Sequence, residues 1–406
     1  MTTFATFMSR QEKILLFILA AINFTHILDF MIIMPLGNYL MPYFHISTTK
    51  FSLIVSAYSY AAFVSGIAAA FIIDRFDRKK SLLFGYIGFI IGTLLCGLAP
   101  DYKFLIAARI LAGLFGGLIG AQVLSIVADT FAYEKRGRAM GYLMAAFSVA
   151  SVLGVPLSLY VANLVSWHAP FIMVALMGFL LIPLIIKYVP PMKDHIVPSA
   201  TSKPAEAFLV IFSRKNAILA IALSALMVFG HFLIIPFLNP FMEFNVGFTK
   251  NQIPLTYIVG GCATLFSAPF FGKLSDKKGK LQVFTICSFL TLPLVYFITN
   301  MPAIAFYYVL VATGIWFIVA NGRMIAAQAM VSNVIEPQYR GSFMSVNSSL
   351  QQLFVGSASL VAGLIVTNDK ITRKIFHYDW VGYLSIAILA FCIFLGYALK
   401  RTAKDL

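Results

Sequence analysis

Two ionisable side chains lie deep within apolar stretches of this sequence, where a charge is costly. Asp29 is the only one of the fifteen acidic residues that falls well inside such a stretch, and Arg109 is one of two basic residues that do. A carboxyl group in a low-dielectric medium favours its neutral form, whereas a neighbouring arginine favours the ionised form. An aspartate and an arginine in this setting can bind a proton in one conformation and release it in another. The chemistry that they indicate is proton exchange.

The depths of these two residues allow them to pair. Counted from Ile14, Asp29 lies ~22 Å along its helix, and Arg109 enters from the opposite side, ~8 Å from the end of its own stretch. We therefore predict that Asp29 is the titrating group and Arg109 its modulator. Two simpler interpretations stay open: a static ion pair that braces two helices, and an arginine whose long side chain reaches back to water.

Further polar side chains in the apolar stretches are candidates for a substrate cavity. Asn23, His26 and Asp29 recur at every third position and share one broad helix face, which we expect to face the cavity. Each candidate can also be a hydrogen-bonded packing residue. The candidates in the second half of the chain are His231, Asn239, Arg323 and Gln351.

The composition identifies lipid as the solvent of these stretches. Apolar residues make up 60% of the chain and charged residues 11%, with a mean hydropathy of +0.90, whereas soluble domains carry about 25% charged residues. The net charge of +15 does not indicate nucleic-acid binding, because the basic residues form short clusters between long apolar runs. The histidines are scattered without metal-ligand spacing, and the sequence has no Gly-Lys-Ser/Thr phosphate loop. We predict no enzyme, no metal, no cofactor and no use of ATP.

Twelve apolar runs are long enough to cross a bilayer as helices, which takes ~20 residues. Each run is self-contained and too long for a barrel strand, so we predict an all-α integral membrane protein. The first run is too long for a signal-peptide core and is expected to be retained. The runs are 14–40, 51–73, 81–99, 104–127, 139–162, 169–189, 217–240, 252–272, 281–299, 303–327, 342–366 and 380–399.

The distribution of basic residues predicts that both termini are cytoplasmic. With that orientation, 22 of the 30 Lys and Arg residues lie in cytoplasmic segments, 6 on the opposite face and 2 inside runs. Such an imbalance follows the positive-inside rule. The compact loops favour a bacterial inner membrane, and we expect a monomer.

The sequence repeats itself at half its length. Residues 29–40 and 231–242 lie 202 positions apart and share their apolar pattern. A repeat of this size indicates a duplication, and six spans per half mean that both halves insert in the same sense. We predict two parallel six-helix bundles, at 1–189 and 216–406, joined by a cytoplasmic linker at 190–215.

One position breaks the repeat, because Asp29 aligns with His231. The halves share a scaffold, but only the first carries the buried carboxylate. We therefore expect proton coupling in the N-terminal half, with His231 facing it across the cavity as a group on the substrate side.

Short charged segments follow the second and eighth runs in the same register, with Asp74 aligned on Asp276. A small residue stands one turn before each aspartate, Ala70 in the first copy and Gly272 in the second. A small residue there lets a neighbouring helix approach closely, and the N-terminus of that helix favours an anion. The simpler interpretation is a pair of ordinary basic loops that obey the positive-inside rule.

These segments resemble motifs of the major facilitator superfamily, and within it those of the twelve-span drug:proton antiporters, over nearly the whole chain. Asp77 stands where the family has a second glycine, and Arg109 matches a family arginine near the central cavity that is implicated in proton coupling. The resemblance implies a charged latch that holds one face of the transporter closed, with Arg136 and Arg340 at the start of the facing helices. The implied latch residues are Ala70, Asp74, Arg75, Arg78, Gly272, Asp276, Arg136 and Arg340.

A further segment in the fifth run resembles the antiporter motif of the family. Gly154 and Pro156 are retained, while Ala150 and Ser158 replace glycines. Gly and Pro in a span produce a bend and a groove for close packing. The resemblance implies export, and generic helix packing is the alternative.

Together these features predict a secondary active transporter that works by alternating access. We expect proton-coupled antiport, with efflux of a small and largely apolar molecule. The alternatives are a proton-coupled transporter of a sugar, an amino acid or a siderophore-like solute, and a non-transporting sensor or receptor built on the same fold.

Overall fold

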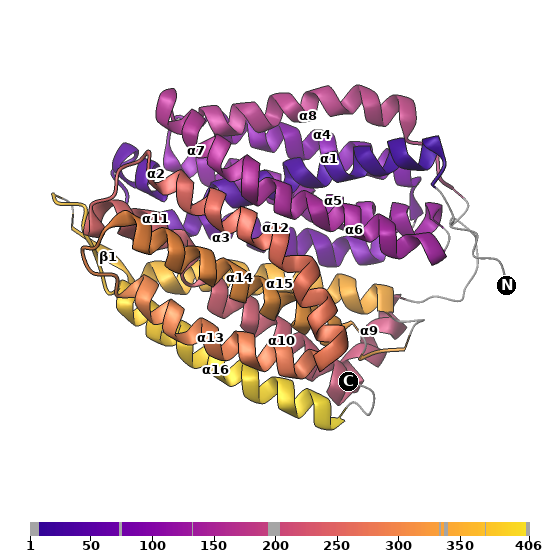
Figure 1. Ribbon diagram of the computed structural model, residues 1–406. Helices are drawn as coiled ribbons and strands as arrows, with labels where there is room; N and C mark the ends of the chain where they lie inside the picture. Colours follow the sequence, from indigo (N-terminus) through magenta and orange to yellow (C-terminus); the bar gives the residue numbers. More distant parts are fainter. Residues whose placement is uncertain are drawn as a thin grey trace.

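The structure is a computed structural model in which two groups of long helices lie side by side (Figure 1). It describes residues 8–72, 75–131, 133–193, 204–332, 334–336, 340–369 and 371–402, without the side chains of 70, 71, 128, 133, 134, 136–138, 144 and 204–208.

The N-terminal half contains six membrane-spanning segments. Its first helix begins with a capping box, in which Ser9 and Glu12 satisfy each other's backbone N–H groups. Asp77 caps the helix that follows the second span. The elements are α1 (Arg10–Ile32), α2 (Gly37–Tyr43), α3 (Thr48–Ile72), α4 (Arg78–Gly97), α5 (Tyr102–Thr130), α6 (Tyr133–Val149), the π-helical segment η2 (Ala150–Gly154), α7 (Val155–Leu164) and α8 (Ala169–Tyr188).

The C-terminal half contains six further spans and a two-stranded hairpin. Its elements are α9 (Pro204–Ser213), α10 (Lys215–Phe232), α11 (Ile235–Phe241), the π-helical segment η3 (Met242–Val246), α12 (Ile253–Lys278), α13 (Lys280–Thr299), α14 (Phe306–Val331), α15 (Arg340–Ile365), β1 (Thr367–Asn368), β2 (Ile375–Phe376) and α16 (Tyr378–Thr402). β1 and β2 are antiparallel, with Thr367 opposite Phe376.

Twelve of the described helical segments are long and apolar enough to span a membrane, which confirms the predicted number and the all-α class. The first and seventh spans are each interrupted near a proline. α1 ends at Ile32 shortly before Pro35, and α10 ends at Phe232 before Pro236. Proline lacks an N–H and disfavours helix at the preceding residue, so the duplicated halves share this break.

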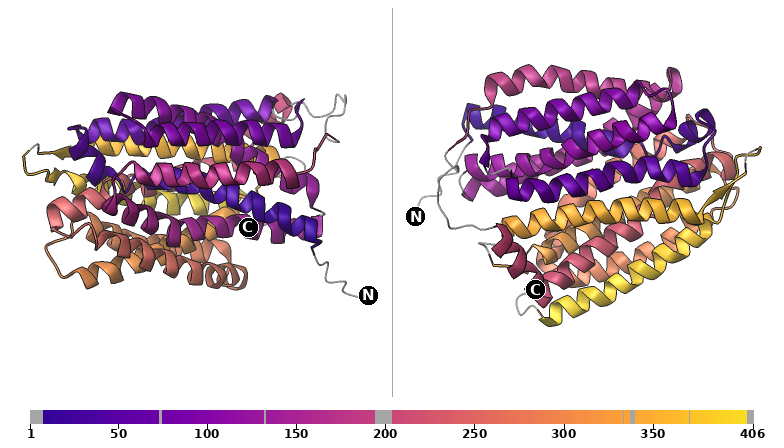
Figure 2. Two further views of the ribbon diagram at one scale, coloured as in Figure 1. Left: turned by 90° about the horizontal axis from the view of Figure 1, so that it is seen from above. Right: turned by 180° about the vertical axis from the view of Figure 1, so that it is seen from behind.

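Both termini lie on one side of the molecule, and the β1–β2 hairpin lies on the other with α2 and α11 (Figure 1; Figure 2, right). We call these the termini side and the hairpin side. α9 falls within the predicted linker, and its residue Ile211 packs into the core of the C-terminal half. The last part of that linker is therefore attached to the second half.

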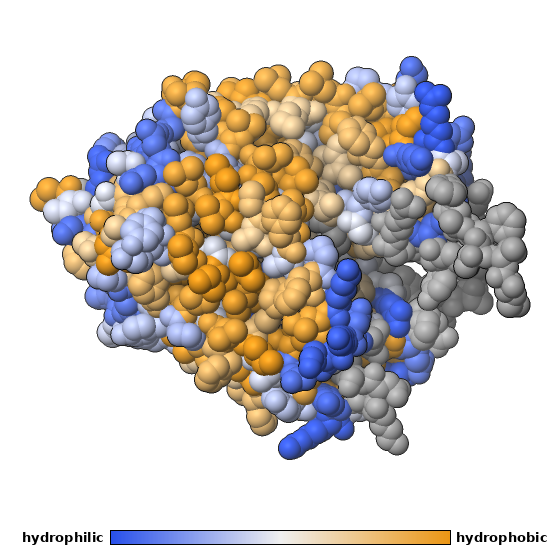
Figure 3. Space-filling model, viewed as in Figure 1, coloured by the Kyte–Doolittle hydropathy of each residue, from blue (hydrophilic) through white to orange (hydrophobic). Residues whose placement is uncertain are grey.

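The exterior of the helices is apolar. Figure 3 shows hydrophobic residues across the middle of the molecule and hydrophilic ones toward its two ends. Large side chains such as Leu180 and Phe266 are 75% and 78% exposed. Exposed apolar surface of this extent requires lipid as the surrounding medium.

The two halves meet along α3 and α15, which are lined by small residues. A Cβ atom on Gly66 would lie 2.6 Å from Ser349 Oγ, and one on Gly356 would lie 3.2 Å from Ser59 Cβ. Gly363 is in still closer contact with Ser52. These contacts recur seven residues apart on each helix, so the two helices run close together from the hairpin side inward.

Hydrogen bonds between the halves gather on the hairpin side. Thr48 Oγ1 donates to the carbonyl of Val366 at 2.6 Å, and Thr49 Oγ1 donates to that of Gly363 at 2.8 Å. Asn38 donates to the carboxylate of Glu243 in the same region. The structure therefore has the halves joined on the hairpin side.

A second junction forms where α12 crosses η2. A Cβ atom on Gly261 would lie 2.7 Å from Val152 Cα, so the two backbones touch. From this crossing α6 and α12 diverge toward the termini side (Figure 1).

Candidate coupling and substrate sites

Asp29 and Arg109 form a fully buried ion pair between α1 and α5. Arg109 Nη1 lies 2.8 Å from Asp29 Oδ2 and 3.4 Å from the Asp29 carbonyl oxygen. Both side chains have no exposed surface. The pairing predicted from their depths is present in the structure, and it joins the first and fourth spans.

Tyr58 of α3 covers the arginine on its other face. The guanidinium carbon of Arg109 lies 4.3 Å from the centre of the Tyr58 ring, a cation–π contact. Gly113, one helical turn after Arg109, lies against the backbone of Tyr58, where a Cβ atom would overlap the Tyr58 carbonyl oxygen. Glycine at this position thus lets α3 approach α5 closely enough for the tyrosine to cover the arginine.

The polar groups of this pair are only partly satisfied. Asp29 Oδ1, Arg109 Nε, Arg109 Nη2 and the Tyr58 hydroxyl make no hydrogen bond with another described residue. Leaving a buried polar group without a hydrogen bond costs ~1–3 kcal/mol. The carboxylate therefore has one oxygen engaged by arginine and a second that can accept a proton.

Asn23 and His26, which share a helix face with Asp29, contact other helices of the N-terminal half. Asn23 Nδ2 donates to the carbonyl of Leu143 on α6 at 3.1 Å. The His26 ring lies edge-on to Phe89 with centroids 5.6 Å apart, and 6.4 Å from the Tyr58 ring. Both side chains are half-buried. His26 thus lies near Tyr58, which also covers Arg109, while Asn23 joins α1 to α6.

His231, which aligns with Asp29 in the repeat, packs against an aromatic ring. It is half-buried and stacks on Trp316 of α14, with centroids 5.1 Å apart and planes inclined by 27°. Trp316 has no exposed surface. The two symmetry-related positions therefore carry an ion pair in one half and a stacked histidine in the other.

A continuous series of rings connects these two positions across the halves. The Phe30 ring lies 5.7 Å from that of Tyr58 and 5.9 Å from that of Phe232. Phe232 in turn lies 5.6 Å from His231. These separations are those of favourable aromatic pairs. Contact thus runs from Arg109 in the N-terminal half to the histidine of the C-terminal half.

The remaining cavity candidates lie in different surroundings. Arg323 has no exposed surface, and its guanidinium makes no hydrogen bond with another described residue. The thiols of Cys287 on α13 and Cys392 on α16 lie near it. Gln351 is half-buried on α15. Arg323 therefore lies within the C-terminal bundle, on the same helix as Trp316 and close enough to His231 for its charge to act on that ring.

Asn239 is fully buried and ties the halves together on the hairpin side. Its Nδ2 donates to the carbonyl of Pro35 at 3.1 Å, and its Oδ1 accepts from the Tyr257 hydroxyl at 3.0 Å. Both bonds position α11 against α2 and α12. In this conformation Asn239 contributes to the closed junction.

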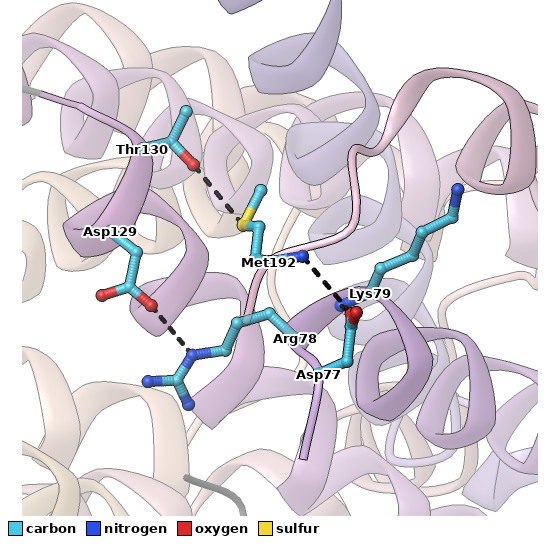
Figure 4. Close-up of polar contacts among 6 residues, drawn as sticks. All are labelled: Asp77, Arg78, Lys79, Asp129, Thr130 and Met192. Atoms are coloured by element: carbon cyan, nitrogen blue, oxygen red, sulfur yellow. Dashed lines mark hydrogen bonds and ion pairs between the residues drawn. The ribbon is translucent and has the colours of Figure 1, made fainter. Parts of the chain in front are cut away.

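The basic segment after α3 is bound to its own half. Arg78 Nε lies 2.9 Å from Asp129 Oδ2 at the end of α5 (Figure 4). Asp77 accepts from the backbone N–H of Lys79 at 2.8 Å, and the N–H of Met192 points at the same oxygen (Figure 4). These contacts hold together the start of α4, the end of α5 and the segment that follows α8.

Several of the implied latch residues lie outside these contacts. Asp74 lies outside the described residues, as do the side chains of Ala70 and Arg136. Arg75 and Asp276 are exposed, and Asp276 makes no ion pair with a described side chain. Gly272 and Arg340 are half-buried, with Arg340 at the start of α15. The latch contacts between the halves therefore remain a prediction.

Gly154 and Pro156 lie where the fifth span becomes π-helical. Pro156 cannot donate a backbone hydrogen bond, and the five residues before Val155 form η2. A Cβ atom on Gly154 would lie 2.7 Å from Leu28 of α1. The segment that resembles the antiporter motif thus touches α1 on one side and α12 on the other.

Sequence reasoning did not identify Tyr58, Trp316 or Asp129 as parts of these sites. Tyr58 and Trp316 are aromatic residues in apolar runs, and such residues are too numerous in this chain to stand out. Asp129 lies just beyond the predicted end of its run, but α5 continues to Thr130. An acidic residue in the last turn of a span, on the same side of the membrane as the basic segment that contains Arg78, could have indicated this ion pair from the sequence.

The comparisons with known proteins agree with the fold and these motifs. The family model of the Major Facilitator Superfamily matches residues 19–359 and 224–405. An uncharacterized transporter of this type, YceJ of Bacillus subtilis (strain 168), is 24% identical over 93% of this chain and 94% of its own. Multidrug resistance protein 2 of the same organism is 25% identical over 84% of this chain and 86% of its own.

Solved structures give the same fold. A bacterial homolog of the human lysosomal transporter Spinster, in an inward-facing and occupied conformation, superimposes with a TM-score of 0.77 over 98% of both chains at 16% identity. The class defined by twelve spans in two parallel halves is that of multi-pass membrane transporters. The chain belongs to the major facilitator superfamily, whose members are transporters and not enzymes.

Proposed function

We propose that the protein is a proton-coupled antiporter that exports a small, largely apolar molecule by alternating access. The observation that carries this proposal is the buried pair of Asp29 and Arg109, with its 2.8 Å contact and no exposed surface. Ionisable residues inside membrane spans are costly and usually mark ion or proton pathways. Asp29 is the proton-binding group, Arg109 sets its charge state, and the coupling ion is H⁺.

The formation of the Asp29–Arg109 ion pair fits the step of the exchange cycle in which the carrier holds no proton. The carboxylate of Asp29 is paired with Arg109 at 2.8 Å, and we assign this conformation to a carrier that has released its proton. The halves are joined on the hairpin side by bonds such as that from Asn239 to Pro35. We propose that the termini side is cytoplasmic, so that substrate binds from the cytoplasm in this state. Protonation from the opposite side then separates Asp29 from Arg109.

The rings between the halves support an apolar substrate. Phe30 and Phe232 meet between Tyr58 and His231, so a ligand entering there encounters mainly aromatic surface. Sites of this kind bind flat or lipophilic molecules through burial of apolar area. The relatives named Multidrug resistance protein 2 and, over 37% of this chain, Multidrug resistance protein 3 support export of drugs.

The remaining assignments follow from the same proposal. The protein acts as a monomer in a bacterial inner membrane, with both termini in the cytoplasm. Arg78, Asp276 and Arg340, at the ends of α4, α12 and α15, hold one face closed at a different stage of the cycle. Gly154 and Pro156 provide the flexible crossing of α7 with α1 and α12.

The test is a flux measurement with purified protein in liposomes. Ethidium and Hoechst 33342 serve as lipophilic probes, and pyranine reports the internal pH. Antiport predicts that an imposed pH gradient drives dye against its concentration gradient and that dye entering the liposomes from outside moves protons out of them. A receptor would bind the dyes without flux in either direction.

A further inference from the structure

A groove of about 510 Å³ opens on the outer surface of the C-terminal half, at the termini side, between the start of α10 and the end of α16. It lies at the ends of two membrane spans, the start of Lys215–Val246 and the end of Tyr378–Thr402. In a membrane protein this level corresponds to the boundary between acyl chains and head groups. The groove is lined by Lys215, Leu219, Phe394, Tyr397, Ala398, Arg401 and Thr402.

The polar end of the groove is positively charged. Lys215 and Arg401 are both exposed, and neither forms an ion pair with a described residue. The adjacent Arg214 is already neutralised, because its Nη1 lies 3.0 Å from Glu336 Oε1. Lys400 adds a further positive charge next to Arg401. Lys215 and Arg401 are therefore available to attract an anion.

The backbone at this end also favours an anion. Lys215 is the first residue of α10, whose N-cap residue Arg214 provides no side-chain cap, so the first N–H groups of this 18-residue helix lie beside Lys215 without a side-chain partner from the N-cap. Asn216 Nδ2 donates to the carbonyl of Thr402 at 3.0 Å. This bond fixes the start of α10 against the end of α16 and keeps the two cationic side chains on either side of one groove.

The walls of the groove are apolar and run away from the charges into the membrane. Leu219 lies one helical turn beyond Lys215, and Tyr397 and Phe394 lie one and two turns before Arg401. Phe394 is 65% exposed and Tyr397 49% exposed. A hydrated anion such as free phosphate would not contact these apolar walls. A molecule with a charged head and a hydrocarbon tail would contact both the basic end and the apolar walls of the groove.

We propose that this groove binds an anionic phospholipid. The phosphate lies between Lys215 and Arg401, and an acyl chain lies along Leu219, Tyr397 and Phe394. Basic pockets between spans at the cytoplasmic surface bind anionic head groups in this way. The lipid would hold α10, which carries His231, against α16, and so brace the C-terminal half while the other half moves.

The test is native mass spectrometry of the full-length protein, released from vesicles that contain equal amounts of phosphatidylglycerol and phosphatidylcholine. The wild type should retain phosphatidylglycerol in preference to phosphatidylcholine. Lys215→Gln with Arg401→Gln should weaken this retention about thirtyfold, because each basic residue near an anionic membrane contributes ~fivefold. The control Lys103→Gln with Lys374→Gln makes the same charge change on the hairpin side and should leave retention unchanged.

Two further measurements separate this lipid from other occupants. Lys215→Arg with Arg401→Lys keeps both charges and should retain the lipid. Inorganic phosphate at high concentration should not displace it, because phosphate lacks the apolar contacts. Equal retention of phosphatidylglycerol by the wild type and the glutamine variant would overturn the proposal, as would displacement by phosphate alone.

Discussion

The rings of Phe30 and Phe232 lie 5.9 Å apart, although the two residues belong to opposite halves of the protein. Each directly follows one of the positions at which the repeat diverges, Asp29 and His231. A change in the position of α1 on protonation of Asp29 must therefore displace a ring that contacts α10. This contact gives the proton-binding half a direct mechanical connection to the half that carries the stacked histidine.

Replacing Phe232 with Ala tests this connection. Loss of an aromatic pair costs ~1 kcal/mol beyond the lost apolar area, so we expect dye efflux driven by a pH gradient to fall about fivefold or more. The matched control is Phe289→Ala on α13, whose side chain is 67% exposed and should be dispensable. Equal efflux in both variants would show that the ring contact plays no part in transport.

The buried ion pair predicts a non-additive effect on stability. Arg109→Ala leaves the carboxylate of Asp29 buried without its partner, which should cost about 3–5 kcal/mol of unfolding free energy. Adding Asp29→Ala to that variant removes the isolated charge and should recover part of the loss. Thermal unfolding of the two single variants and the double variant in detergent measures this coupling. If the losses of stability in the two single variants add up to the loss in the double variant, the ion pair has no coupling energy.

Gly113 is predicted to control how closely Tyr58 covers the arginine. Gly113→Ala places a methyl group against the Tyr58 backbone and should lower stability by ~1–3 kcal/mol, with a parallel loss of transport. Gly120 on the same helix has no atom within 4 Å of an added Cβ. Gly120→Ala should therefore be neutral or slightly stabilising, since alanine favours a helix over glycine. Thermal unfolding of the two variants measures this difference in stability.

Because Gly363 touches Ser52, we predict that a larger residue at position 363 shifts the protein away from the conformation in which the hairpin side is closed. A valine at position 363 would force α15 away from α3 and disfavour closure of the hairpin side. Spin labels at positions 103 and 374, both exposed on that side, should report a longer distance in Gly363→Val than in the wild type. Gly341→Ala, at the opposite end of α15 with no atom near its added Cβ, should give the wild-type distance. An unchanged distribution in both would count against α3 and α15 as the closing seam.

Much of the architecture could be predicted from the sequence, because hydrophobic runs of bilayer length leave few alternatives to a membrane helix. The pairing of Asp29 with Arg109 also followed from position along the helices. The rotation of each helix about its own axis could not be predicted from the sequence, because a helix that is apolar all round has no polar face to orient it. For this reason the sequence did not show that Arg323 lies near Cys287 of α13 and Cys392 of α16, or that Tyr58 lies beside Arg109.

The most direct test of the central claim is transport by Asp29→Asn in proteoliposomes. Asparagine keeps the shape of the side chain but cannot exchange a proton, so the account predicts that a pH gradient no longer drives ethidium against its concentration gradient. Exchange of labelled for unlabelled ethidium without a gradient should persist, which would show that the variant is folded and can still bind the dye. Gradient-driven accumulation at the wild-type level in Asp29→Asn would contradict the assignment of proton coupling to this residue.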